Sequence, residues 1–198
     1  MNKKYYIKDY VILRQGRLIR NGEVLLEAGN PELKDFLRKI YKSFGMRYPK
    51  FFKMDDLSRL GFLAAEILFD QEKPEADTAL IFANSSSCLE TDKAYSKTMS
   101  GFPSPSLFVY TLPNIVLGEI SIRHGLRSEN LFLVQDRFEP TTMIDYSHSL
   151  LNKAKASNVL CGWVDLHNTD YDVFLWQIAA SGRLEHNEEE LNKIYLPE

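Results

Sequence analysis

Residues 104–127 read SPSLFVYTLPNIVLGEISIRHGLR, and residues 130–134 read NLFLV. Pro113 suits the first turn of a helix, where no amide hydrogen is needed, and Gly125 suits the left-handed residue that follows a helix. The apolar residues 130–134 predict a short strand. Residues 135–140, QDRFEP, then form a loop, and a further helix is expected from Pro140 to about Lys155. The order helix, strand, loop, helix is typical of an α/β fold.

The chain on either side repeats this alternation of strands and helices. Asn21 and Gly22 predict a hairpin turn, because both residues tolerate the positive φ of a two-residue turn. Asn30 and Pro31 predict the cap and first turn of a helix that ends near Gly45. The other predicted elements are a strand over 5–13, hairpin strands within 17–27, a helix beginning after residue 55 or 56, a buried strand over 78–83, a polar loop over 84–88, a helix over 90–99, and strands over 157–165 and 171–179.

This order of elements predicts the fold class. Strands that alternate with helices favour a mostly parallel sheet with right-handed crossovers. The last two predicted strands are separated only by His167–Asp170, which is short enough for an antiparallel hairpin. We therefore expect an α/β protein whose sheet has one antiparallel strand, followed by a charged tail from Gly182 to Glu198.

Composition indicates a globular protein with one core. The chain has 198 residues, of which 44% are hydrophobic and 26% charged, with a net charge of −3. This charge gives no reason to expect nucleic acid or an anionic membrane as a partner. The N-terminus lacks the apolar stretch of a signal peptide, and no window approaches the roughly 18 apolar residues of a membrane span. The two cysteines, Cys88 and Cys161, lie in unlike contexts, which predicts a reduced, cytoplasmic protein.

Several segments resemble the β-ketoacyl synthases, which have a thiolase-like fold. Residues 104–134 resemble the stretch that leads to the reactive cysteine of that family, and Pro113, Asn114 and Gly118 match its most specific short motif. Residues 159–165 resemble the strand after the nucleophile helix. The resemblance runs from about Tyr48 to Ala180, so it covers the N-terminal half of a ketosynthase.

The resemblance implies a thiolase-like half-domain. It is expected to hold a mostly parallel five-stranded sheet with one antiparallel strand and an added N-terminal hairpin and helix. Within a single domain, residues 1–47 would form the added hairpin and helix, residues 48–180 the thiolase-like core, and residues 181–198 the tail.

Two departures from the family indicate lost catalysis. Arg137 stands at or beside the expected nucleophile position, and its guanidinium stays protonated, so it cannot attack. Pro140 also stiffens a turn that is built of small residues in the family. The chain in addition lacks the second half, whose histidines the condensation reaction needs. We therefore predict no catalytic residue, and a protein that resembles 3-oxoacyl-[acyl-carrier-protein] synthase but is inactive alone, a pseudoenzyme.

Other reactive residue types give weak signals. Cys88 is a weak alternative nucleophile in an exposed loop, and the simpler interpretation is a small loop residue beside an interface. Cys161 belongs to a strand core. The four histidines lack metal-ligand spacing; His124 suits a helix C-terminus, and His148 faces either a pocket or solvent. We expect neither a metal nor a cofactor.

A lone half-domain is expected to need a partner. Met143, Ile144, Leu150 and Leu151, with the two terminal strands, predict an exposed apolar sheet face, which usually marks association. The strand over 130–134 is a predicted open edge that invites pairing. The expected interface residues are Phe102, Phe108, Asn130, Phe132 and Val134. The partner would be a second copy, giving a homodimer, or a ketosynthase, giving a heteromer.

Three functions remain open at this point. The first is a non-catalytic accessory subunit of fatty acid, polyketide or polyene assembly, similar to a chain length factor. It would also dock an acyl carrier protein through Arg123, Arg127 and Arg137. The second is an acyl-transferring enzyme that uses Cys88 or a catalytic half from another chain. The third is a scaffold or acyl-binding module.

Overall fold

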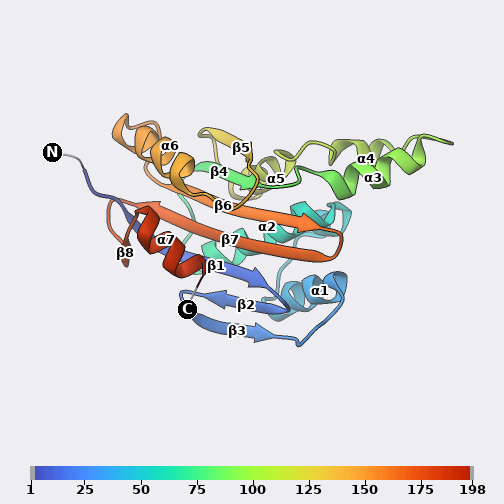
Figure 1. The fold of residues 1–198 in the computed structure, drawn as a ribbon, viewed down its shortest axis with the longest axis horizontal. Coiled ribbons are helices and arrows are strands. Elements are labelled where there is room, and N and C mark those ends of the chain that lie inside the picture. The colour runs from blue at the N-terminus through green and yellow to red at the C-terminus, as the bar shows by residue number, and fades with distance from the viewer. Residues whose placement is uncertain (1–2, 197–198) are drawn as a thin grey trace.

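The computed structural model describes residues 3–196 and forms one mixed sheet with helices on both faces (Figure 1). None of the helices in this range is long and apolar enough to cross a membrane. The elements, in chain order, are β1 (Tyr6–Arg14), β2 (Arg17–Arg20), β3 (Glu23–Glu27), α1 (Leu33–Ser43), a 3₁₀ helix (Pro49–Lys53), α2 (Asp56–Phe69), β4 (Ala79–Asn84), α3 (Leu89–Thr98), α4 (Pro105–Val109), α5 (Ile115–His124), β5 (Asn130–Val134), α6 (Thr141–Asn152), β6 (Val159–His167), β7 (Asp170–Ala179), β8 (Leu184–Glu185) and α7 (Glu188–Tyr195).

The strand order of the sheet is β3-β2-β1-β7-β6-β4-β5, and β8 pairs with β1. Strand β4 runs parallel to both β5 and β6, whereas β7 runs antiparallel to both β6 and β1. Among β1, β7, β6, β4 and β5, four strands therefore point the same way and β7 points the opposite way. The predicted α/β class and the mostly parallel five-stranded core with one antiparallel strand are confirmed.

The sheet has eight strands, more than the predicted five-stranded sheet. Strand β1 lies between β7 and β2, and it pairs with β7 from Tyr6 opposite Ala179 to Arg14 opposite Asp172. The first strand of the segment 1–47 is thus an inner strand of the sheet, and only β2 and β3 extend beyond it. Local pattern cannot reveal such a pairing, because the two partners lie far apart in the sequence. The division of the chain at residues 47 and 180 stays a prediction.

Helix α1 begins two residues later than Pro31, at Leu33, with Glu32 at its cap. The preceding loop is held against the β1–β2 turn, where the Ala28 amide donates to the Gly16 carbonyl at 2.9 Å. Gly16 has a φ of 72°, and a Cβ there would lie 2.3 Å from the Gly29 carbonyl oxygen. This close approach of two backbone segments delays the start of the helix.

Helix α2 is the central element of one sheet face. Asp55 caps it by accepting a hydrogen bond from the Ser58 amide at 3.0 Å, as its sequence predicts. Gly61 allows a close crossing with α5, since a Cβ there would lie 2.7 Å from Val116 Cγ2. Together with α1 and α5, this helix buries one apolar cluster that includes Phe62, Phe82 and Leu175.

The second face of the sheet is covered by α6 and α7. Met143 is 0% exposed, Leu150 4% and Leu151 8%, and Ile144 is half-buried. Residues 159–164 and 173–178 of β6 and β7 are buried as well. The prediction of an exposed apolar face around α6 is therefore wrong. The C-terminal helix α7, whose Leu191 is 0% exposed, covers this face from within the chain.

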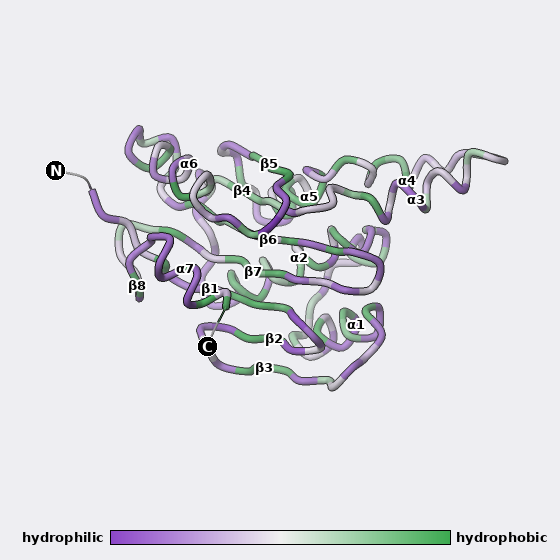
Figure 2. The backbone as a smooth tube through the Cα atoms, in the orientation of Figure 1, coloured by the Kyte–Doolittle hydropathy of each residue, from purple (hydrophilic) through white to green (hydrophobic). Residues whose placement is uncertain are grey.

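Helices α3 and α4 form an arm that projects from one end of the molecule (Figure 1). We use "arm" for residues 89–109, that is, the two helices and their connection. The tube through this segment carries hydrophobic as well as hydrophilic residues (Figure 2). Apolar side chains therefore reach a part of the molecule that stands away from both apolar clusters.

Candidate functional site

The loop between β5 and α6 comprises residues 135–140 and contains no cysteine or serine. Its first residue, Gln135, donates its amide hydrogen to the Asn84 carbonyl at 2.9 Å, which holds the loop beside the end of β4. Arg137 is exposed in this loop, and Pro140 directly precedes the first residue of α6. A protonated guanidinium has no lone pair with which to attack an acyl group.

Phe138, the residue after Arg137, packs onto the sheet. Its ring stacks on Tyr195 of α7 at a centroid distance of 4.0 Å and lies 5.8–6.1 Å from Trp163, Phe174 and Trp176. Phe138 is not among the site residues predicted from the sequence, although an aromatic residue between Arg137 and Glu139 was a usable signal. An aromatic side chain therefore anchors the loop at the place where the resemblance puts the reactive turn of the β-ketoacyl synthases.

Cys88 does not lie in an exposed loop. It is 4% exposed at the N-cap of α3, and its Sγ donates to the Thr111 carbonyl at 2.8 Å. Burial raises the pKa of the Cys88 thiol to about 11, and the nearby Asp92 carboxylate adds to the rise. Since the thiolate is the reactive form, this geometry opposes a role as nucleophile. Cys161 is 0% exposed, as expected for a core residue.

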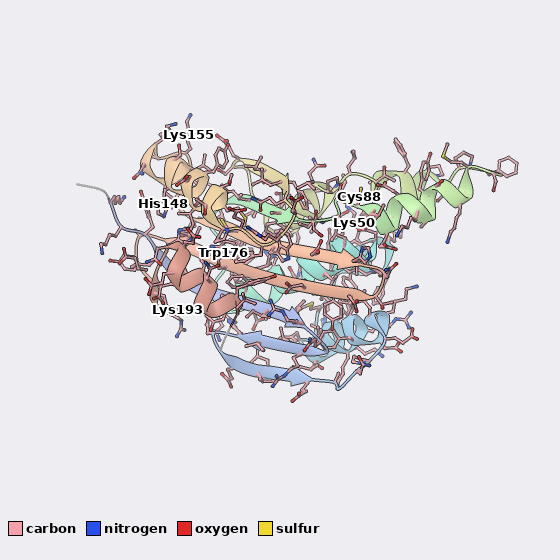
Figure 3. The ribbon with its side chains drawn as sticks, viewed as in Figure 1. Lys50, Cys88, His148, Lys155, Trp176 and Lys193 are labelled. Atoms are coloured by element: carbon pink, nitrogen blue, oxygen red, sulfur yellow. The ribbon has the colours of Figure 1, made fainter. Side chains whose placement is uncertain are left out.

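Buried polar groups fix the base of the arm. Glu119 of α5 is 4% exposed and accepts a hydrogen bond from the Tyr110 hydroxyl at 3.1 Å. Lys50 Nζ lies 2.8 Å from the other oxygen of the same carboxylate. Thr91 of α3 donates to Asp55, the cap of α2, at 2.7 Å. Lys50 and Cys88 both lie at this base in Figure 3. The base of the arm is thus ordered by ion pairing and hydrogen bonding.

The outer part of the arm is apolar and exposed. Phe102, in the connection between α3 and α4, is 99% exposed. Met99 is 62% exposed, Phe108 58% and Val109 48%. The Phe108 ring contacts only the arm's own Tyr95 among the aromatic pairs of residues 3–196, at 5.5 Å. Phe102 and Phe108, two of the predicted interface residues, therefore lie where a partner could reach them.

Strand β5 is one edge of the sheet. Within residues 3–196, its outer side pairs with no other strand. Val134 is 59% exposed, Asn130 is exposed, and Phe132 is half-buried against the cluster under α2. The structure thus brings three of the predicted interface residues to an open edge.

The motif residues Pro113, Asn114 and Gly118 lie at the start of α5. Asn114 is the N-cap, and Gly118 is in the second turn. Within residues 3–196, no atom lies within 4 Å of a Cβ built on Gly118, so packing inside the chain does not require glycine there. Ile122, one turn further along α5, is 68% exposed. This face of α5 adjoins β5, since Asn130 donates to the Ser121 hydroxyl at 3.3 Å.

In the part of the chain that the structure describes, the histidines form no metal site. Within residues 3–196, no group of three or more histidine, cysteine, aspartate or glutamate residues could hold a metal ion. His124 lies in the last turn of α5, as predicted, and its Nε2 is 2.9 Å from Glu66. His148 is half-buried and contacts His186 at 2.9 Å, so it does not lie on the free polar helix face that we considered.

Comparison with known proteins identifies the fold. Neither a protein-family model nor a curated protein sequence matches the chain. Among solved structures, the ishigamide ketosynthase/chain length factor matches with a TM-score of 0.69 and 14% identity over 89% of this chain. The chain has a ketosynthase-like fold. It spans 62% of the length of that ketosynthase-like chain.

Two further ketosynthase structures match over similar lengths. One is a ketosynthase in complex with its chain length factor from Xenorhabdus doucetiae, with a TM-score of 0.63, 12% identity, and coverage of 90% of this chain and 80% of that chain. The other is a type II polyketide acyl-carrier protein in complex with its ketosynthase bound to the hexaketide, with a TM-score of 0.56, 12% identity, and coverage of 90% and 64%. These ketosynthase-like matches extend beyond residues 48–180, which are about two thirds of the chain.

Proposed function

We propose that the chain is a non-catalytic, ketosynthase-like subunit that binds a ketosynthase in an acyl-chain assembly system of the fatty acid, polyketide or polyene type. The observation that carries this proposal is the apolar arm, above all Phe102, which is 99% exposed. Large exposed apolar side chains that gather in one place usually mark an association surface. The match to ketosynthases that are complexed with a chain length factor supports a heteromer.

The loop after β5 supports an accessory role over an enzymatic one. Arg137 cannot act as a nucleophile. Cys88, the weak alternative, is buried, and its pKa is raised to about 11. An acyl-transferring role for this chain alone has no activated nucleophile to support it.

The proposed interface combines the arm with the β5 edge and the adjoining face of α5. A second strand could pair with β5, because its outer backbone groups are open. Gly118 would let a partner approach α5 closely, and the exposed Ile122 would be covered by it. We place this association in the cytoplasm, consistent with two unpaired cysteines.

An acyl carrier protein is a second proposed partner. Arg123 is held by both oxygens of Glu66 at 3.0 Å, so it is less available for a carrier. Arg127 and Arg137 are exposed, and they remain the arginines proposed to contact acidic carrier residues. The match to a ketosynthase in complex with an acyl-carrier protein supports an acyl carrier protein as the second partner.

The test is affinity purification of the tagged full chain from its own organism, followed by measurement of binding to the ketosynthase recovered. We expect a stable complex with a ketosynthase. Phe102→Asp should weaken this complex at least about tenfold, because a charge would replace an apolar anchor. Arg127→Glu should weaken carrier binding and leave ketosynthase binding unchanged.

The matched control is Leu196→Asp, which places a charge at a residue that is 67% exposed beyond α7 and outside the arm. This variant should bind the ketosynthase as the unaltered chain does. Recovery of the chain without any ketosynthase, or equal binding by the Phe102→Asp variant, would overturn the proposal.

A further inference from the structure

The C-terminal segment covers an aromatic cluster on the second sheet face. We call residues 184–195, that is, β8 and α7, the latch. Beneath it lie Phe138, Phe174 and Trp176, with ring centroids 4.8–6.1 Å apart. Tyr195 of the latch stacks on Phe138, and Leu191 is 0% exposed. Figure 1 shows α7 lying across the sheet on the side of α6. The latch therefore shields these rings from water.

Contacts of Arg14 and Asp172 with Tyr195 hold the end of the latch. The Tyr195 hydroxyl donates to Asp172 of β7, and Arg14 Nε donates to the same carboxylate at 2.9 Å. Arg14 also donates to the Tyr195 carbonyl at 3.0 Å and lies over the Tyr195 ring, 4.7 Å from its centroid. These contacts join α7 to β1 and β7.

A histidine pair holds the start of the latch. His186 is 2% exposed, and its amide donates to the Tyr5 carbonyl at 2.9 Å. The Trp176 indole donates to His186 Nε2 at 3.1 Å, so this nitrogen is unprotonated. The hydrogen of His186 must then be on Nδ1, which lies 2.9 Å from His148 Nε2 and donates to it. Figure 3 shows His148 and Trp176 in this part of the molecule.

This chain of hydrogen bonds requires two neutral imidazoles. An added proton on His148 Nε2 would face the Nδ1 hydrogen of His186, and an added proton on His186 Nε2 would face the indole hydrogen of Trp176. Burial, together with a smaller contribution from the neighbouring His148, lowers the pKa of His186 to about 3. Burial also lowers the pKa of His148, although Asp145 opposes this. The closed latch thus resists protonation.

The groups around the pair do not supply a strong compensating charge. The Tyr5 ring packs 5.1 Å from His148, and the Tyr5 hydroxyl donates to Asn152. The charged groups on the packed elements are Asp145 on α6, Lys3 at 5.5 Å over the Tyr5 ring, Lys4 paired with Glu185, Glu188, which accepts a hydrogen bond from Thr141, and Lys193 of α7, which pairs with Glu189 and Glu190. Of these, Asp145 favours a charged His148.

We propose that the latch is an acid-released cover: protonation of His148 and His186 detaches residues 184–195 and exposes the aromatic cluster of Phe138, Phe174 and Trp176 to water. When the latch is open, the histidines face water and regain an ordinary pKa near 6.5. The closed form is therefore fully favoured above pH 6.5, and it loses stability as the pH falls from 6.5 toward 3. His186 alone should raise the opening equilibrium about tenfold per pH unit in this window.

Native-state hydrogen exchange on the full chain tests the proposal, with α7 amides read separately from β7 amides. After correction for intrinsic exchange rates, the opening constant of α7 should rise at least about 100-fold between pH 8 and pH 4.5. The β7 amides should stay protected at pH 4.5. Exchange of α7 and β7 together at every pH would overturn the proposal, because the latch would then not open by itself.

A double variant, His148→Gln and His186→Gln, separates the pair from other titrating groups. Glutamine can accept and donate hydrogen bonds without gaining charge. In this variant the opening constant of α7 should therefore rise by less than about twofold between pH 8 and pH 4.5. The control, His124→Gln with His167→Gln, should keep the full rise. An unchanged rise in the first variant overturns the proposal. If that variant does not fold, histidine proton NMR of the unaltered chain decides: His186 titrating near 6.5 in the closed protein also overturns it.

Discussion

The sheet face under α6 and α7 and the arm of α3 and α4 both carry aromatic side chains, but only the first is covered. Phe174 on the sheet face is 0% exposed, whereas Phe102 on the arm is 99% exposed. The chain supplies its own cover, α7, for the first region and none within residues 3–196 for the second. The difference indicates where another molecule can add stability, which is the arm and the β5 edge.

Two phenylalanine truncations should show the largest contrast between the regions. Phe174→Ala should lower the free energy of unfolding by about 3–5 kcal/mol, because it removes a buried ring and leaves a cavity. Phe102→Ala, the matched change on the arm, should stay within about 0.5 kcal/mol. Urea unfolding of the three proteins measures both. Equal losses of unfolding free energy in the two variants would mean that the arm packs against the rest of the protein in solution. The contrast between a covered sheet face and an exposed arm would then be wrong.

The reactivity of the Cys88 thiol tests whether the base of the arm is shielded from solvent, in contrast to the exposed tip. At pH 8 a thiol with a pKa of about 11 is about 0.1% ionised, compared with about a quarter for an ordinary cysteine. Alkylation of Cys88 should therefore be at least about 100-fold slower in the folded protein than in urea. Mass spectrometry of the labelled peptide measures the rate.

An exposed cysteine on the arm provides the reference for that rate. Ser100 is exposed between α3 and α4, and Ser100→Cys should be alkylated at the rate of an unfolded cysteine. Cys88 that reacts as fast as the introduced thiol would contradict the closed base, and it would restore the acyl-transfer alternative.

The smallest expected effect concerns the hydroxyl of Tyr110. Tyr110→Phe removes the hydrogen bond to the buried Glu119 carboxylate, which should cost about 1–2 kcal/mol of unfolding free energy. Tyr95→Phe, a hydroxyl removal on the arm itself, is the control and should cost less than about 0.5 kcal/mol. Denaturant unfolding compares the two. A neutral Tyr110→Phe change would show that Lys50 alone satisfies Glu119.

Much of the local structure could be predicted because its signals lie within a few residues. Asp55 caps α2, Gly125 follows α5 with a φ of 70°, and β5 spans residues 130–134 as predicted. Each of these features depends on a cap, a turn or a short apolar run, and each can be recognised from a few consecutive residues.

The site was harder to predict because burial depends on distant contacts. Cys88 looked like an exposed loop residue, but its burial depends on contacts with Asp92 and with the distant Thr111 carbonyl. The sheet face around Met143 looked uncovered, because a short charged tail gave little sign that Leu191 and Tyr195 would pack there. Arg137 was placed correctly in its loop, whereas the role of Phe138 required the positions of Trp163 and Trp176.

The inner position of β1 has a consequence for how the protein is made. Its partner β7 begins at Asp170, so at about 5–20 residues per second a ribosome delivers that strand about 10–30 s after β1. During this interval β1 can pair only with β2 on one side, and its other edge stays open. Pairing of such distant segments also slows folding. Nascent chains should therefore depend on protection of the open edge of β1 until β7 has been synthesised.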